Sequence, residues 1–290
     1  MYSPEFDYHR ARSVAEAQQL LAANPGAKLL AGGHSLVPLL KLRLAAPTAL
    51  VDIGRVPELR GIARHGDDIR IGSLTTHAEL AASADLRSSA AALAEAAATI
   101  GDPAVRNRGT IGGNIAHADP ASDLPTVLVA MDARIVVADP KGERTILADT
   151  FFTGIMSTAL REDEILLAVH VPASTRGQAS AYEKFSHPAS RYAVVGAAAV
   201  ITVQGGKCSG ARVALGGLLP HARRATAVEQ ALIGHAATDD VIAQAAKQVV
   251  AELGDDVTGD IYASAEYRAA MAPVFIKRAV TTAVLRASRL

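Results

Sequence analysis

The chain has little of the chemistry that forms disulfides or holds metal clusters. Its 290 residues include one cysteine, Cys208, so an internal disulfide is excluded. An iron–sulfur cluster is excluded as well, because it needs about four protein ligands. Residues 1–12 carry charges and a proline and lack the apolar core of a signal peptide. These features favour a reducing compartment, and we expect a cytoplasmic protein.

The chain also lacks an excess of charge of either sign and any long apolar run. Its formal net charge is zero, which argues against nucleic acid or an anionic membrane as partner. The longest apolar stretch, residues 192–203, has 12 residues, whereas a transmembrane helix needs about 20. We therefore expect no transmembrane segment.

Several common catalytic and nucleotide-binding motifs are missing. The G-x-G-x-x-G fingerprint of a Rossmann fold is absent, and so is the P-loop pattern G-x-x-x-x-G-K-[ST]. The zinc-protease motif H-E-x-x-H and the hydrolase motif G-x-S-x-G are absent too. None of His117, His170, His187 and His221 has a partner at metal-ligand spacing, so we expect no metal site.

The patterns that are present predict an α+β protein. Ser13 and Glu16 form a capping-box pattern before a helix that runs to Ala23. Strands are predicted at 28–31, 49–53, 68–72, 134–138, 144–147, 164–171, 180–186, 193–203 and 208–216. Helices are predicted at 76–82, 89–100, 123–131, 225–233, 239–253 and 264–289, while 55–66 reads as irregular and 109–114 as a glycine-rich loop.

These elements divide the chain into three parts. Residues 1–55 form a small first lobe, 56–176 a second lobe and 177–290 a C-terminal domain, with a polar linker at 172–178 before that last domain. In the C-terminal part, strands are followed by helices. We expect those helices to cover one face of an antiparallel sheet.

Two double-glycine segments are the most informative local features. Gly32 and Gly33 follow a short apolar strand and precede His34 and Ser35, while Thr110–Asn114 has a hydroxyl, two glycines and an amide. Glycine lets a ligand approach the backbone, and successive amides in a turn bind anions. Each segment alone also fits an ordinary turn. Together, two such loops about 75 residues apart suggest that two lobes close around one dinucleotide.

The same segments carry a resemblance to a known family. The chain resembles the flavoprotein subunit of the xanthine dehydrogenase and aerobic carbon monoxide dehydrogenase group of molybdenum hydroxylases. The matching stretches are AGGHSL at 31–36, TIGGN at 110–114, ASDLP at 121–125, YEKF at 182–185 and SAEYRAAMAPVFIKRA at 264–279. The resemblance covers essentially the whole chain. It implies a two-lobed FAD-binding domain of the vanillyl-alcohol oxidase (PCMH) type and a separate C-terminal domain.

The resemblance also assigns FAD contacts by position. The first lobe supplies Lys28, Leu29, Leu30, Ala31, Gly32, Gly33, His34, Ser35 and Leu36, and the second lobe supplies Ile100, Gly101, Thr110, Gly112, Gly113, Asn114, Ser122, Asp123 and Leu166, with Lys184 and Tyr192 added by the C-terminal domain. Some related oxidases attach FAD covalently through a histidine in a G-G-H context. The carbon monoxide dehydrogenase branch implies non-covalent FAD here, with main-chain contact at His34.

Several of these residues also have plain structural interpretations. Ile100 and Leu166 are typical core residues, and Asp123 fits the start of a helix. Lys184 lies on a strand, where its side chain could point to solvent, and Tyr192 fits the end of a strand.

The resemblance implies an electron-transfer role. A large partner subunit would hold the molybdenum cofactor and a small one the [2Fe–2S] clusters, in a dimer of heterotrimers. FAD on this chain would pass electrons to NAD, a quinone or another acceptor, and no side chain here would act as acid, base or nucleophile. The alternatives are a stand-alone flavin oxidoreductase of the same fold and a cofactor-free scaffold. The substrate, whether carbon monoxide, a purine, an N-heterocycle or an aldehyde, is not encoded in this chain.

Overall fold

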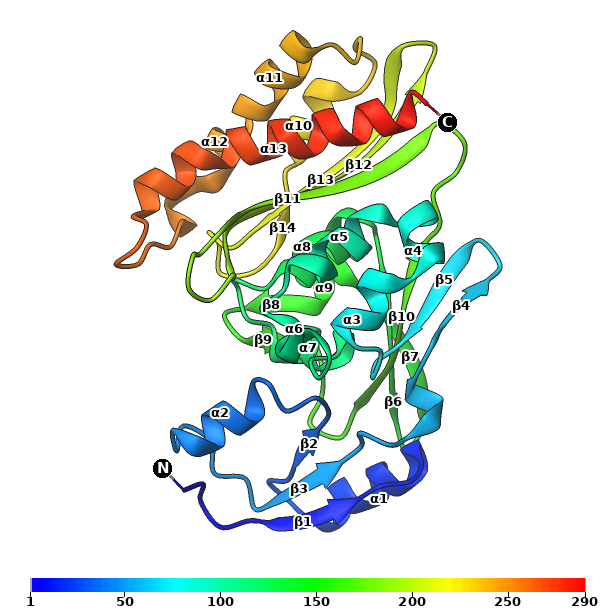
Figure 1. Cartoon of the computed structure of the whole chain (residues 1–290), viewed down its shortest axis with the longest axis vertical. Helices are drawn as coiled ribbons and strands as arrows, with labels where there is room; N and C mark the ends of the chain where they lie inside the picture. The colour runs from blue at the N-terminus through cyan, green and yellow to red at the C-terminus, as the bar shows by residue number, and fades with distance from the viewer. Residues whose placement is uncertain (1, 290) are drawn as a thin grey trace.

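The computed structural model describes residues 2–289 as three blocks stacked along the long axis of the molecule (Figure 1). A small sheet near the N-terminus lies at one end, a larger sheet with several helices in the middle, and the C-terminal sheet with its helices at the other end. No helix in this part of the chain has both the length and the apolar character needed to cross a membrane.

The first lobe is a parallel sheet with one long helix. Strands β1 (Asp7–Arg10), β3 (Ala49–Asp52) and β2 (Lys28–Leu30) lie in that order, beside helix α1 (Val14–Ala23) and the short helix α2 (Leu36–Lys41). Ser13 caps α1, because its hydroxyl accepts the Glu16 amide at 3.1 Å. The core of the lobe includes Ile165 from the next block, so the two lobes share one apolar cluster.

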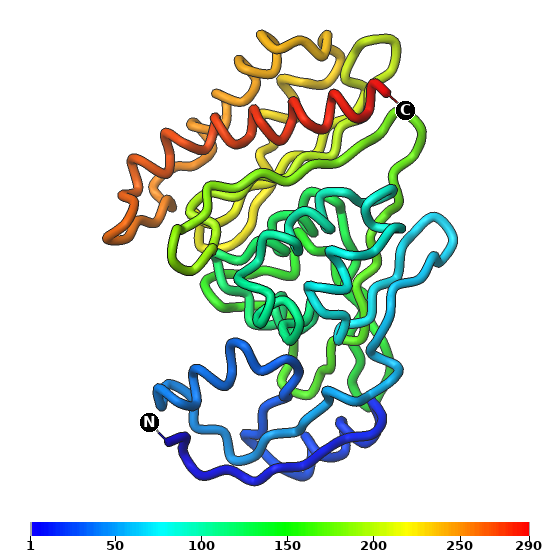
Figure 2. Tube along the Cα trace, in the orientation of Figure 1, coloured from blue at the N-terminus to red at the C-terminus, as the bar shows by residue number. Residues whose placement is uncertain are grey.

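The second lobe has a five-stranded antiparallel sheet in the order β4-β5-β10-β6-β7. Its strands are β4 (Ile62–His65), β5 (Asp68–Gly72), β6 (Arg134–Asp139), β7 (Gly142–Leu147) and β10 (Ile165–Pro172), and a separate hairpin pairs β8 (Phe152–Gly154) with β9 (Ser157–Thr158). Its helices are α3 (His77–Ala82), α4 (Ala84–Ser89), α5 (Ala91–Thr99), α6 (Pro103–Arg106), α7 (Ile111–His117), α8 (Asp123–Ala130) and α9 (Ala148–Phe151). Helices α5 and α8 also pack against the C-terminal sheet, and Figure 2 shows their trace between the two sheets.

The C-terminal block is a four-stranded antiparallel sheet covered by helices. Strands β11 (Gln178–Ser186), β12 (Ala193–Gln204), β13 (Lys207–Gly216) and β14 (Arg223–Arg224) are followed by α10 (Thr226–Leu232), α11 (Asp239–Lys247), α12 (Val249–Leu253) and α13 (Ala265–Ala287). Successive side chains alternate between the two faces of the sheet. Ala198 therefore packs toward α5 and α8, whereas Ala197 and Ala199 join the core beneath α13.

Most of the expected elements are present, but three expectations are wrong. The glycine-rich segment 109–114 is not all loop, because Thr110 caps a helix that begins at Ile111. The helix expected at 239–253 is interrupted at Gln248, whose amide bonds Ala245 three residues back. The segment 55–66 contains a 3₁₀ turn, Pro57–Leu59, and strand β4. The helix at Ile111 and strand β4 depend on partners elsewhere in the chain, which local sequence preference does not report.

Candidate flavin site

The first glycine loop offers a row of unused main-chain donors. Strand β2 ends at Leu30, and α2 begins at Leu36. Within the described residues, the five amides from Gly32 to Leu36 donate no hydrogen bond to protein atoms. Gly33 has φ +78°, a conformation that favours glycine. A loop with successive free amides suits an anion such as a diphosphate.

The second glycine segment is built differently. Its amides are largely used within the protein, because Ile111 donates to Thr75 at 2.9 Å and Gly112 donates to Ser73 at 2.8 Å. Gly113 donates to the Thr110 hydroxyl at 3.1 Å. The amides of this segment are therefore held by protein acceptors, and the first loop offers the free main-chain donors.

The two segments lie in direct contact. An ideal Cβ on Gly32 would lie 2.8 Å from the carbonyl carbon of Arg108, closer still to its oxygen, and 3.1 Å from Cα of Gly109. An ideal Cβ on Gly113 would lie 3.8 Å from Cβ of Ala31. The loop after β2 accordingly lies next to the α6–α7 region (Figure 1). The two lobes therefore meet main chain to main chain at this contact, here called the seam, and a ligand bound to the free amides of the first loop would lie close to both lobes.

The segment expected near the flavin ring is held by a residue that sequence reasoning missed. Ile100 ends α5 and Gly101 follows with φ +46°. The guanidinium of Arg106 donates to the Ile100 carbonyl at 2.9 Å and to the Gly101 carbonyl at 3.0 Å. Arg106 therefore fixes this turn. No pattern in the sequence marks it, since it is one basic residue in a short helix.

A buried ion pair joins the second lobe to the C-terminal domain. The Lys184 ammonium lies 2.9 Å from one carboxylate oxygen of Asp123, and each side chain is 4% exposed. Lys184 also donates to the carbonyls of Thr99 at 3.1 Å and Arg191 at 2.7 Å. The interpretation of Lys184 as a solvent-facing strand residue is therefore wrong. Burial raises the pKa of Asp123, and the charge of Lys184 opposes that rise.

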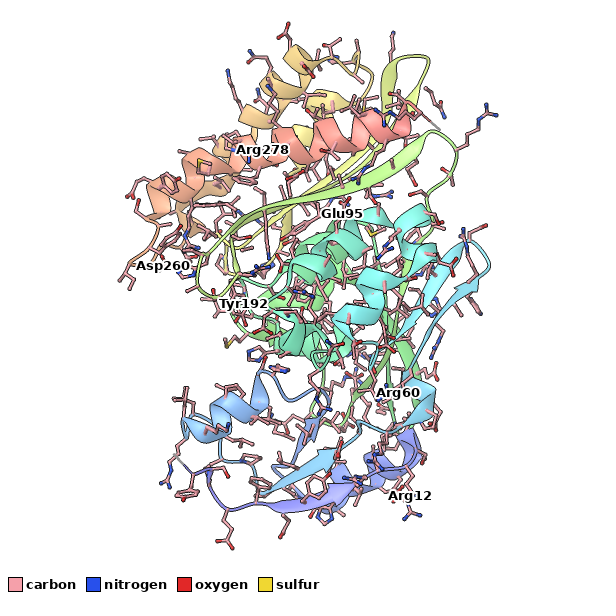
Figure 3. The ribbon with its side chains drawn as sticks, viewed as in Figure 1. Arg12, Arg60, Glu95, Tyr192, Asp260 and Arg278 are labelled. Carbon is pink, nitrogen blue, oxygen red and sulfur yellow. The ribbon has the colours of Figure 1, made fainter. Side chains whose placement is uncertain are left out.

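The other expected residues are spread around this centre. Ser122 precedes α8 and donates from its hydroxyl to the Asn114 side-chain oxygen at 2.7 Å. Tyr192 is 44% exposed in the loop before β12 (Figure 3), and burial followed by the nearby charges of Asp119 and Asp123 raises its pKa. Leu166 is buried in the core, where β10 pairs with β6. Leu29 and Leu30 are half-buried, whereas Lys28 and His34 are exposed.

His77 is a second residue that sequence reasoning missed. It is 3% exposed, and its ring packs against Gly109, where an ideal Cβ would lie 2.8 Å from its Cδ2 and Nε2 atoms. Burial, and then the positive charges of His34 and Arg106, lower the pKa of His77 to about 4. His77 is therefore uncharged at neutral pH, and it packs against the second glycine segment where the two lobes meet.

Comparison with known proteins identifies the family. Residues 4–174 match the model described as the FAD binding domain in molybdopterin dehydrogenase, and residues 180–283 match the CO dehydrogenase flavoprotein C-terminal domain. The chain belongs to this family of FAD-binding subunits. The carbon monoxide dehydrogenase medium chain of Hydrogenophaga pseudoflava is 43% identical over 99% of both chains. The 6-hydroxypseudooxynicotine dehydrogenase complex subunit alpha of Paenarthrobacter nicotinovorans is 40% identical, over 99% of this chain and 97% of the relative.

Solved structures of this family share the whole fold. A carbon monoxide dehydrogenase structure from Hydrogenophaga pseudoflava superposes with a TM-score of 0.94 at 44% identity, covering 99% of both chains. Quinoline 2-oxidoreductase from Pseudomonas putida 86 gives 0.92 at 31% identity, covering 99% of both chains. The expected fold class and family, the oxidoreductase-subunit assignment and FAD as the cofactor are therefore confirmed. The individual FAD contacts and the domain boundaries at 55 and 176 stay predictions.

Proposed function

We propose that this chain carries non-covalent FAD as the electron-transfer subunit of a cytoplasmic molybdenum hydroxylase. A small partner subunit with [2Fe–2S] clusters would deliver the electrons, and a large partner subunit would hold the molybdenum cofactor. The relatives are named as a medium chain and as a subunit of a complex, which supports an assembly of this kind. The observation that carries the proposal is the contact between the two glycine segments beside five free amides.

The geometry suggests how the chain holds the cofactor. Amides from Gly32 to Leu36 would donate to the diphosphate, while Gly113, which has no side chain, would allow close approach to the main chain of the second lobe. Asp123 lies near Tyr192, Lys184 and the turn at Ile100, where the other end of the cofactor would lie. When bound, FAD exchanges one or two electrons at a time, which links one-electron clusters to two-electron acceptors. The chain's part is to bind, orient and shield that group.

The stand-alone flavin oxidoreductase is the less favoured alternative. It would turn over a substrate without partner chains, whereas the full-length relatives are named as parts of larger assemblies. The cofactor-free scaffold is disfavoured by the free amides of the first loop, because unpaired main-chain donors are rarely retained without a ligand or water.

Purification with untagged partners tests the proposal. We expect two further chains to co-purify, molybdenum and iron in the metal analysis, and a mass that fits two copies of each of the three chains. The flavin absorbance should pass into the supernatant on acid precipitation. A yellow pellet would instead show covalent attachment, and turnover by the chain alone would support the stand-alone enzyme. Colourless protein that does not take up FAD would refute the proposal.

A further inference from the structure

Strand β11 presents every second side chain to the FAD-binding domain. Ser180, Tyr182 and Lys184 point that way, because Ser180 accepts the Ala92 amide at 3.1 Å and the other two reach Asp123. The alternate residues Ala181 and Phe185 pack in the core on the opposite face of the sheet. The C-terminal domain thus directs a hydroxyl and an ammonium at one carboxylate of the second lobe.

Tyr182 is held in place by contacts on three sides. Its hydroxyl donates to one carboxylate oxygen of Asp123 at 2.5 Å, while Lys184 takes the other oxygen. Its amide donates to Glu95 at 3.1 Å, and Figure 3 shows Glu95 beneath β11. Gly196 on the next strand leaves the space that the hydroxyl needs, because an ideal Cβ there would lie 2.6 Å from it.

We propose that Tyr182 is a positioning residue of the flavin site, which orients Asp123 so that the carboxylate accepts hydroxyl groups of the FAD sugar chain. The inference rests on the proposed function and deepens it. A carboxylate has about four lone-pair positions, and the C-terminal domain occupies two of those of Asp123. The remaining positions suit hydroxyl donors, and they remain acceptors only while the group is ionised.

The Tyr182 hydroxyl is one of the groups that affect the ionisation of Asp123. Burial raises the pKa of this carboxyl, and Lys184, then the Tyr182 hydroxyl, lower it again. Among the described residues, the ionisable groups that face it are Lys184 and Tyr182 on β11 and Tyr192 before β12, whose pKa the charges of Asp119 and Asp123 help to raise after burial. Loss of the Tyr182 hydroxyl therefore raises the pKa of Asp123. The ionised form then disappears at a higher pH as the solution is acidified.

The test is flavin retention as a function of pH, measured on the complex purified with its partners. FAD fluorescence after dilution reports release between neutral and acidic pH. We expect Tyr182→Phe to lose flavin at a pH higher than wild type by about one unit, as for one lost hydrogen bond to a charged group. Tyr267→Phe is the matched control, because Tyr267 is 48% exposed and packs beside Phe185 on the other face of the sheet.

A second pair of variants separates positioning from general loss of structure. We expect Asp123→Asn, which has no titrating carboxyl, to bind FAD more weakly than wild type and without an acid-dependent step, and adding Tyr182→Phe to it should not introduce one. If Tyr182→Phe does not fold, Gly196→Ala displaces the same hydroxyl and should give the same shift. An unmoved profile in Tyr182→Phe, or equal flavin loss at every pH, would overturn the inference while leaving the proposed function intact. Wild-type complex without FAD would overturn both.

Discussion

Replacing Gly32 by alanine tests the closeness of the two lobes. The added methyl carbon would lie 2.8 Å from the carbonyl carbon of Arg108, whereas ordinary contact begins at 3.4 Å. The obstacle is main chain on both sides, so no rotamer change relieves it. The seam must widen by at least about 0.6 Å, the difference between these distances, and by more at the carbonyl oxygen.

This widening falls where the diphosphate is proposed to bind. Overpacking of this kind costs about 1–3 kcal/mol, and we expect most of it to appear as lost affinity. That range corresponds to FAD binding weaker by about fivefold to 150-fold. The assay is the FAD content of the purified complex, followed by titration of the flavin-depleted complex with FAD and detection by fluorescence.

Gly210→Ala is the matched control for Gly32→Ala. Its added carbon would lie 3.4 Å from the Thr202 hydroxyl oxygen, which is ordinary contact, on the C-terminal sheet away from the seam. We expect this variant to bind FAD like wild type. If Gly32→Ala also bound FAD like wild type, the lobes would not close on the ligand as tightly as the geometry requires, and the reasoning would be refuted.

Three further predictions concern stability. Arg268→Met removes a buried guanidinium that bonds three main-chain carbonyls, so we expect a loss of about 2–4 kcal/mol in urea unfolding. The control Arg278→Met, at an exposed residue that lies over the Phe275 ring, should lose about 1 kcal/mol or less. The Arg144 hydrogen bond lowers the pKa of Glu164, so this pair stabilises the fold above the unfolded pKa and the effect is lost on acidification. Glu164→Gln should therefore destabilise the protein at pH 7 and much less at pH 3. Lys184→Met leaves a buried carboxylate unpaired, so we expect about 3–5 kcal/mol less stability and loss of flavin.

Local signals predicted the start of α1, the strand before the first glycine loop and the hairpin between β6 and β7. The capping residue Ser13, the apolar run into Gly32 and the turn at 139–142 are each specified within a few residues. The helix at Ile111 was missed, because two glycines normally oppose helix formation. Its stability comes from Ser73 and Thr75, about 40 residues earlier, which accept the amides of its first turn. A local sequence pattern does not reveal hydrogen bonds between segments so far apart in the chain.

The sequence predicted the two glycine loops of the site but not the hydrogen bonds that join its side chains. The double glycines identified the seam, because glycine is needed wherever two backbones approach. The burial of Lys184 was not predictable, since its partners Thr99, Asp123 and Arg191 come from three different segments. The sequence placed Lys184 on a strand, where alternate side chains share a face. It gave no reason to think that this side faces a carboxylate.

The three parts of the chain contribute different things to the proposed flavin site. The first lobe provides free amides, and the second lobe provides a glycine segment that leaves no space for side chains. The C-terminal domain provides Lys184, which pairs with Asp123 at the other end of the site. Because Lys184 bonds to Thr99 and Arg191 at once, the turn at Ile100 and the loop that carries Tyr192 cannot move independently. The C-terminal domain therefore sets the geometry of the proposed flavin end of the site, even though the two glycine loops lie entirely outside it.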